Sequence, residues 1–139
     1  MTTGQAATIG GTALEKQYQE GNYWGMVASV DVHGVNPAHI RSEETLTKFV
    51  DGLVAAVDMV KHGPLHLERF GDESKHPGPG YSAMQFIETS SVTIHCDEYE
   101  NRIFIDLFSC KFFDPEIARA FSLSFFEGSD ATMTYTLRG

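Results

Sequence analysis

The sequence predicts an α+β fold, a two-layer sandwich in which an antiparallel β-sheet carries two helices on one face. Three observations lead to this fold class. Short runs with a period of two, separated by polar reversals, are typical of strands that pair with their neighbours in the chain. Two longer stretches carry apolar residues at helical spacing along one side. The order is strand, helix, four strands, helix, strand, and two amphipathic helices suffice to cover one face of such a sheet.

The size of the chain fits one domain. Its 139 residues, 15.4 kDa in mass, are enough to bury a core without disulfides. We divide the chain into a flexible N-terminal arm over residues 1–21 and a single domain over residues 22–139. The arm is small and polar, with a short helix over residues 13–19 as the alternative, and we assign it no chemistry.

The charge and composition exclude several classes of partner. A net charge of −9, with only ten Lys and Arg residues, disfavours binding to nucleic acid or to an anionic membrane and suits a small cationic amine substrate. The sequence has no apolar run near twenty residues and no signal peptide at its start, so we expect a cytoplasmic protein. The two cysteines, Cys96 and Cys110, are interpreted as reduced thiols.

The first half of the domain is expected to form a strand, a helix and a short second strand. Residues 23–33 alternate as a strand does. After Ser42, the expected N-cap, one apolar helical stripe runs through Leu46, Phe49, Val50, Leu53, Val57 and Val60. Residues 61–64, Lys-His-Gly-Pro, are expected to close this helix with a glycine at its C-terminal cap. Residues 65–70 form the second strand.

The second half is expected to form four strands and a helix. Residues 71–80, rich in Gly, Pro and charge, are expected to form a loop that borders the site. Strands follow over residues 82–88, 91–96 and 102–109. Asp114 as N-cap and Pro115 in the first turn open a helix that runs to about residue 125. The last strand covers residues 132–137.

Residues 80–110 hold the side chains with chemistry. Ser82, Ser90, His95 and Cys110 supply two hydroxyls, an imidazole and a thiol, a set that provides a nucleophile, a base and an acid. We expect antiparallel pairing to bring them together. Each also has an ordinary interpretation: a turn serine, a strand histidine bonded to a carbonyl, a small buried cysteine. No metal site is expected, because His95 and Cys96 lack a second pair of ligands.

The spacing of these four residues resembles the small prokaryotic S-adenosylmethionine decarboxylase proenzymes, which are pyruvoyl-dependent. In that family eight residues lead from a serine to the self-processing serine, five more to a histidine and fifteen more to a cysteine. Ser82, Ser90, His95 and Cys110 keep all three offsets. Weaker similarity extends over about residues 22–139 and includes Val-Asp-Val-His-Gly at residues 30–34. The resemblance implies a pyruvoyl-decarboxylase-like domain with a fold of the predicted type.

The resemblance implies that the chain cuts itself between Thr89 and Ser90. Ser90 Oγ would attack the carbonyl of Thr89, with Ser82 bonded to the adduct, and His95 would remove the Ser90 α-proton. Residue 90 would become a covalent pyruvoyl group, whose carbonyl forms an imine with the substrate amine and accepts electrons as carbon dioxide leaves. Cys110 would then protonate the product carbon. The resemblance therefore implies a pyruvoyl cofactor derived from Ser90.

The sequence departs from the family pattern at two places. The family has Glu before the processing serine and His after it, where this chain has Thr89 and Ser91. The family glutamate that binds the substrate ribose is replaced by Tyr99. The candidate substrate-binding residues are therefore those of one turn: Asp97, Glu98, Tyr99 and Glu100. This turn also suits the distal cation of ornithine or arginine, and its ordinary interpretation is a solvated turn.

We expect a self-processing decarboxylase of S-adenosylmethionine that acts in polyamine (spermidine) biosynthesis. The first alternative is the same chemistry on L-ornithine or L-arginine. The second is a processing-defective homologue that acts as a regulatory or binding protein. The resemblance also implies a homodimer of processed protomers, and Phe113, Phe125 and Phe126 are candidate interface residues.

Overall fold

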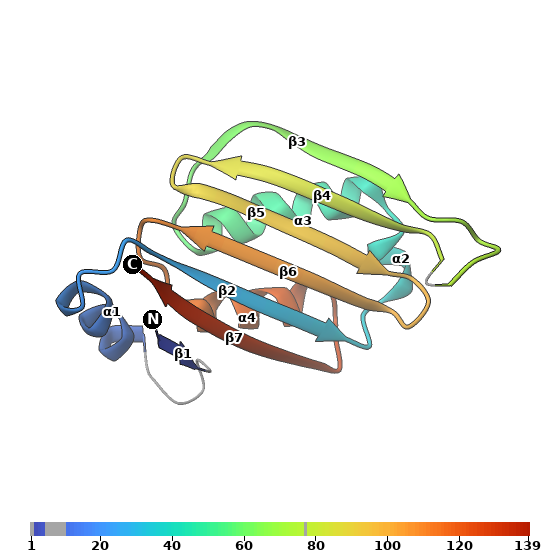
Figure 1. Ribbon diagram of the computed structural model, residues 1–139. Coiled ribbons are helices and arrows are strands. Elements are labelled where there is room, and N and C mark those ends of the chain that lie inside the picture. The colour runs from blue at the N-terminus through green and yellow to red at the C-terminus, as the bar shows by residue number, and fades with distance from the viewer. Residues whose placement is uncertain (1, 5–10, 77) are drawn as a thin grey trace.

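Seven antiparallel strands form one sheet in the computed structural model, which describes the backbone of residues 2–4, 11–76 and 78–139 (Figure 1). The strands are β1 (Thr2–Gly4), β2 (Gly25–His33), β3 (Lys61–Phe70), β4 (Gly80–Ile87), β5 (Ser90–Asp97), β6 (Arg102–Ser109) and β7 (Asp130–Arg138). Their order across the sheet is β1-β7-β2-β6-β5-β4-β3. Every neighbouring pair is antiparallel, as the alternating runs predict.

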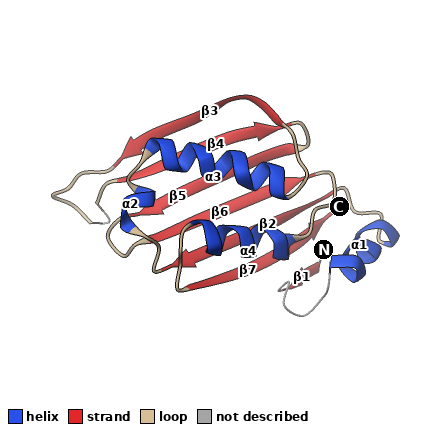
Figure 2. Ribbon diagram, turned by 180° about the vertical axis from the view of Figure 1, so that it is seen from behind, coloured by secondary structure: helices blue, strands red, loops and turns tan. Residues whose placement is uncertain are grey.

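The helices leave one face of the sheet open. They are α1 (Gly11–Glu20), α2 (Pro37–Ile40), α3 (Glu43–Ala56) and α4 (Pro115–Phe125). Figure 2 shows α3 and α4 lying across the same face, while α1 lies at the end of the sheet near the C-terminus. The predicted α+β sandwich with two covering helices is confirmed. None of the helices in the described part of the chain is long and apolar enough to span a membrane.

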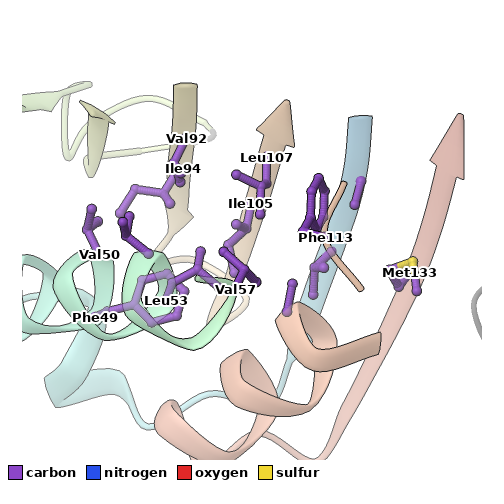
Figure 3. Close-up of a cluster of buried hydrophobic side chains, with 14 of the residues drawn as sticks. Phe49, Val50, Leu53, Val57, Val92, Ile94, Ile105, Leu107, Phe113 and Met133 are labelled. Atoms are coloured by element: carbon purple, nitrogen blue, oxygen red, sulfur yellow. The ribbon is translucent and has the colours of Figure 1, made fainter. Parts of the chain in front are cut away.

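The core lies between the sheet and the two covering helices (Figure 3). Phe49 and Leu53 of α3 are fully buried and face Ile94 and Ile105 of the central strands. The Phe49 ring also packs on the ring of Phe126, with 4.5 Å between centroids. Complete burial of one such side chain stabilises a fold by about 1.5–3 kcal/mol. The helical stripe after residue 42 therefore supplies one wall of the core.

Helix α3 begins as predicted and ends earlier. Ser42 accepts a hydrogen bond from the Thr45 N–H at 3.1 Å, which confirms the N-cap. The chain leaves the helix at Asp58, whose φ of 59° is left-handed, and the Met59 N–H bonds the Val54 carbonyl at 2.9 Å, the pattern of a Schellman cap. The predicted end at residues 61–64 is wrong, because these residues belong to β3. A short Asp side chain tolerates the left-handed conformation that the prediction reserved for glycine.

The starts of α4 and α2 and the N-terminal segment also bear on the sequence predictions. Asp114 caps α4 by accepting from the Glu116 N–H at 2.9 Å, as predicted. The same signal, Asn36 followed by a proline, opens α2, which the prediction missed. At the N-terminus a helix covers residues 11–20, and β1 pairs with β7. Residues 5–10 of the predicted flexible arm lie outside the described residues.

The helix end at Asp58 gives a test of the cap. Replacing Asp58 by Gly is expected to leave a protein about 1 kcal/mol more stable than replacing it by Ala, because only glycine adopts a positive φ without strain. Both variants lose the carboxylate that lies 3.4 Å from Lys111 Nζ, so they are matched. Urea unfolding of the two variants measures the difference. Equal stabilities would contradict the left-handed cap.

Candidate active site

The four predicted catalytic residues fall into two groups at opposite ends of β5. Ser82 and His95 form one group, and Ser90 with Cys110 forms the other. His95 is five positions after Ser90 on the strand, so their Cα atoms lie about 16 Å apart at roughly 3.3 Å per residue. The expectation that antiparallel pairing unites all four residues is wrong within one protomer, because it holds only for residues that face each other across neighbouring strands.

The register of β4 and β5 places Ser82 directly opposite His95. The Ser82 Oγ lies 2.8 Å from the His95 Nδ1, so the two side chains share a proton. His95 is exposed and lies on the face of the sheet that the helices leave open. The pair therefore forms a Ser–His dyad in which the other ring nitrogen remains available to act on a group outside the hairpin.

The dyad lines a groove of about 610 Å³ beside the edge strand β3. His66, Glu68 and Phe70 of β3 form one wall. A neighbouring hollow is lined by parts of the loop over residues 71–80 together with Ser82, so the predicted loop does border the dyad. The groove is large enough for a small molecule and mixes apolar walls with a carboxylate and two imidazoles.

The second group surrounds the peptide bond between Thr89 and Ser90. The Thr89 carbonyl accepts a hydrogen bond from the Cys110 N–H at 2.9 Å. The Thr89 side chain is also held, because its Oγ1 accepts from Ser109 Oγ at 2.9 Å and donates to the Met59 Sδ at 3.2 Å. Ser109 is completely buried. Thr89, on the N-terminal side of this peptide bond, is therefore held by Ser109 at the end of β6, by Cys110 just after it, and by Met59 after α3.

Ser90 has a strained backbone. Its φ of 149° lies where side-chain-bearing residues are rare, a conformation that costs about 1–3 kcal/mol. Viewed along the N–Cα bond, the Cβ lies a third of a turn from the carbonyl carbon of the same residue. This φ therefore turns the Ser90 Cβ toward the side of the Thr89 carbonyl carbon. A regular strand would turn it away. The strain thus brings the hydroxyl-bearing side chain nearer the carbonyl that it is predicted to attack.

Arginines neutralise the acidic turn after β5. Arg69 binds Glu98 with two hydrogen bonds of 2.6 and 3.0 Å, and the Glu98 side chain is only 8% exposed. Arg102 binds Asp97 at 2.6 Å and Glu100 at 2.9 Å. The charges of these carboxylates are therefore satisfied within the protein.

The four candidate substrate-binding residues of this turn are an exposed tyrosine and three paired carboxylates. Tyr99, which replaces the family glutamate, is 70% exposed and stacks edge-on against His76, 5.0 Å between centroids. Asp97 and Glu98 are committed to arginines, and so is Glu100. That Asp97, Glu98, Tyr99 and Glu100 bind substrate stays a prediction.

The pKa of two groups near this turn is shifted. Burial acts to raise the pKa of Asp97, but hydrogen bonds from Arg102 and from the Glu100 and Tyr99 N–H groups outweigh it and hold the pKa below its usual value. Burial, reinforced by Glu98, raises the pKa of the Cys96 thiol to about 12. Cys96 is therefore a protonated, structural thiol at neutral pH.

The candidate interface residues are mostly buried, contrary to expectation. Phe113 and Phe126 are 3% and 0% exposed, and Phe125 packs against Phe49, so all three contribute to the core. The prediction of exposure failed because Phe113, just before α4, and Phe125 and Phe126, at its end, all pack toward the core. Among the described residues, the exposed large apolar side chains on and beside the sheet include Trp24, Phe70, Met84 and Phe86.

Three residues near the site were missed by the sequence analysis: Tyr18, Met59 and Ser109. Met59 and Ser109 contact Thr89, and Tyr18 reaches the carbonyl of Cys110. Ser109 directly precedes Cys110 in the sequence, and this adjacency was the available signal. Nothing in the sequence marks Met59 or Tyr18, because their contacts join segments that are far apart in the chain.

The fold is that of a decarboxylase of known structure. The adenosylmethionine decarboxylase from Aquifex aeolicus VF5 matches with a TM-score of 0.70 over 84% of this chain and 92% of that chain, at 18% sequence identity. The sequence profile of the S-adenosylmethionine decarboxylase family matches residues 27–139. This chain therefore belongs to the S-adenosylmethionine decarboxylase family, and membership implies a decarboxylase. Among curated proteins none matches the chain by sequence.

The ion pair of Asp97 gives a test by pH. Because the pKa of Asp97 is lower in the folded protein, its contribution to stability is present above the ordinary value of 3.8 and is lost as the pH falls through the folded value. Asp97→Asn is expected to lower the free energy of unfolding by about 0.5–1 kcal/mol at neutral pH, and by less at the lowest pH at which the wild-type protein stays folded. Urea unfolding at both pH values measures this. The exposed Glu73→Gln serves as the control, and a deficit of Asp97→Asn that persists in acid would contradict the ion pair.

Proposed function

We propose that this chain is a self-processing, pyruvoyl-dependent decarboxylase of S-adenosylmethionine, active in the cytoplasm in spermidine biosynthesis. The observation that carries the proposal is the Thr89–Ser90 peptide bond, whose carbonyl is held by the Cys110 N–H and whose serine is strained toward that carbonyl. Membership of the S-adenosylmethionine decarboxylase family supports the decarboxylase activity. The local geometry supports the route by which the chain would make its own reactive carbonyl.

The residues around Ser90 suit the processing chemistry. Ser90 Oγ attacks the Thr89 carbonyl carbon, the Thr89–Ser90 amide bond breaks, and an ester forms in its place. The Cys110 N–H already bonds the oxygen on which negative charge develops, so it stabilises the adduct without rearrangement. Removal of the Ser90 α-proton expels the Thr89 carboxylate. Addition of water then releases ammonia and leaves the pyruvoyl group at residue 90.

The same residues fit the finished group. A pyruvoyl group supplies an electrophilic carbonyl that accepts electrons when an amine substrate loses carbon dioxide. Cys110 is exposed and directly follows β6, and its N–H contacts the Thr89 carbonyl, which supports a role for its thiol in holding a proton beside the reacting carbon. Thr89, the new C-terminus, would remain anchored by Ser109.

We infer that the base comes from a second copy of the chain. A general base must lie within hydrogen-bond reach of its proton, and His95 lies about 16 Å along the strand from Ser90 in the same protomer. The open face of the sheet carries exposed Met84 and Phe86, which suit burial against another protein surface. If two open faces pack about a two-fold axis that runs across the strands, each dyad approaches the Ser90 end of the partner. This arrangement supports a homodimer of processed protomers.

S-adenosylmethionine is the favoured substrate. The alternative, a basic amino acid, requires a free carboxylate in the turn after β5, and the three carboxylates there are paired with arginines. Glu68, which is exposed in the groove beside the dyad, offers a negative charge for the cationic sulfonium. Release of labelled carbon dioxide from S-adenosylmethionine, L-ornithine and L-arginine, assayed in parallel, decides between these substrates.

Cleavage is the first test of the proposal. The purified wild-type chain is expected to give two fragments, residues 1–89 and 90–139, whereas Ser90→Ala stays a single 15.4 kDa chain. Intact-mass measurement distinguishes them, and hydrazine should trap the new carbonyl in the wild type alone. The neighbouring Ser91→Ala is the matched control and should still be cut. A wild-type chain that stays whole and does not react with hydrazine would contradict the proposal and favour the alternative of a processing-defective homologue.

Mixing two variants tests the shared site. Ser90→Ala retains the dyad but has no processing serine, and His95→Ala retains the serine but has no base. Neither is expected to be cut alone. When the two are co-expressed, dimers that contain one of each should cut the His95→Ala chain, because the partner supplies the histidine. Mass spectrometry identifies which chain is cut, and an uncut mixture of proven heterodimers would place the base within the protomer.

A further inference from the structure

We propose that Tyr18, on the N-terminal helix α1, is a positioning residue for Cys110. The proposal rests on the proposed function, in which Cys110 holds a proton beside the reacting carbon. It assigns a role to a segment that precedes the family match at residues 27–139. Helix α1 would thereby become part of the active site of this protein.

Helix α1 is fixed against the body of the protein. Leu14 and Tyr18, one helical turn apart, are 0% and 6% exposed. The Tyr18 ring packs against Phe112, with 5.7 Å between centroids. Figure 1 shows α1 at the end of the sheet where β6 finishes, which is also the end that holds the β4–β5 turn. Tyr18 therefore reaches the site from outside the sheet.

The Tyr18 hydroxyl lies between two backbone carbonyls. It is 3.1 Å from the Cys110 oxygen and 3.0 Å from the Trp24 oxygen, so its single proton is shared between them. Burial, and next the proximity of Cys110, raise the pKa of Tyr18. The hydroxyl is thus a proton donor throughout the physiological range, and it links α1 to the residue that follows β6.

Cys110 is held on both sides of its Cα. Its N–H donates to the Thr89 carbonyl at 2.9 Å, and its own carbonyl accepts from Tyr18. Cys110 lies beyond the last residue of β6, where no further ladder bond fixes it, and its side chain is exposed. The two bonds together restrict the backbone angles of Cys110, and these angles set the direction of its thiol. Without the Tyr18 hydroxyl only the N–H side stays anchored.

The test uses Tyr18→Phe, which keeps the ring and removes the hydroxyl. Tyr135→Phe is the matched control, because Tyr135 is also a buried tyrosine, 1% exposed, and lies on β7. In the uncut Ser90→Ala background, Tyr18→Phe is expected to speed hydrogen exchange of the Cys110 amide by about threefold to tenfold, the effect of losing one hydrogen bond. The rate at which iodoacetamide alkylates Cys110, followed by peptide mass mapping, should change by at least about threefold. The control should change neither.

The processed enzyme gives the functional measurement. Tyr18→Phe is expected to lower kcat for decarboxylation by about threefold to tenfold with KM unchanged, because the thiol acts after substrate has bound. The proposal is overturned if Cys110 exchange, Cys110 alkylation and kcat all match those of Tyr135→Phe, or if KM rises in step with a fall in stability. If the wild-type chain fails to cut itself, the proposed function fails, while the Cys110 measurements in the Ser90→Ala background still decide the role of Tyr18.

Discussion

The register of three neighbouring strands determines what this protein can do. Pairing of β4 with β5 sets Ser82 opposite His95, and pairing of β5 with β6 sets Ser90 opposite Ser109. A slip of one residue would move every side chain of a strand to the other face of the sheet. The alternation of buried side chains on β6, at Ile103, Ile105 and Leu107, opposes such a slip, because it would place three apolar residues in solvent. The core therefore fixes the positions of the residues that carry the chemistry.

The two faces of the sheet have different roles. One face packs under α3 and α4 and supplies stability. On the other face Met84 and Phe86 are exposed, while the alternate residues of the same strand, Ala83 and Ile87, are buried. A strand with larger apolar side chains on its open face than on its buried face is unusual for a surface that meets only water. This pattern in β4 supports the proposed packing of two open faces against each other.

The sequence predicted the elements better than their ends. Strands β5 and β6 agree with the alternating runs to within a residue, and the caps at Ser42 and Asp114 are where residue preference placed them. The end of α3 was misplaced because Asp58 took the left-handed conformation that is more common for glycine.

The candidate site was predicted in its residues and not in its arrangement. Spacing identified Ser90 and His95, but the same spacing along one strand keeps them apart, a consequence of strand geometry that residue matching overlooks. The strain at Ser90 and the contact of Tyr18 with Cys110 depend on backbone angles and on segments distant in the chain. The sequence pattern alone therefore predicts neither the strain at Ser90 nor the contact of Tyr18.

Strand order has a consequence for a chain cut after Thr89. The first piece would contain β1, β2, β3 and β4, and the second β5, β6 and β7. Across the sheet β7 lies between β1 and β2, and β2 lies between β7 and β6. Strands of the two pieces would therefore alternate across part of the sheet. The pieces would be joined between β1 and β7, along both edges of β2, and between β4 and β5. Separating them would break four strand pairings at once, so cleavage of one peptide bond need not loosen the molecule.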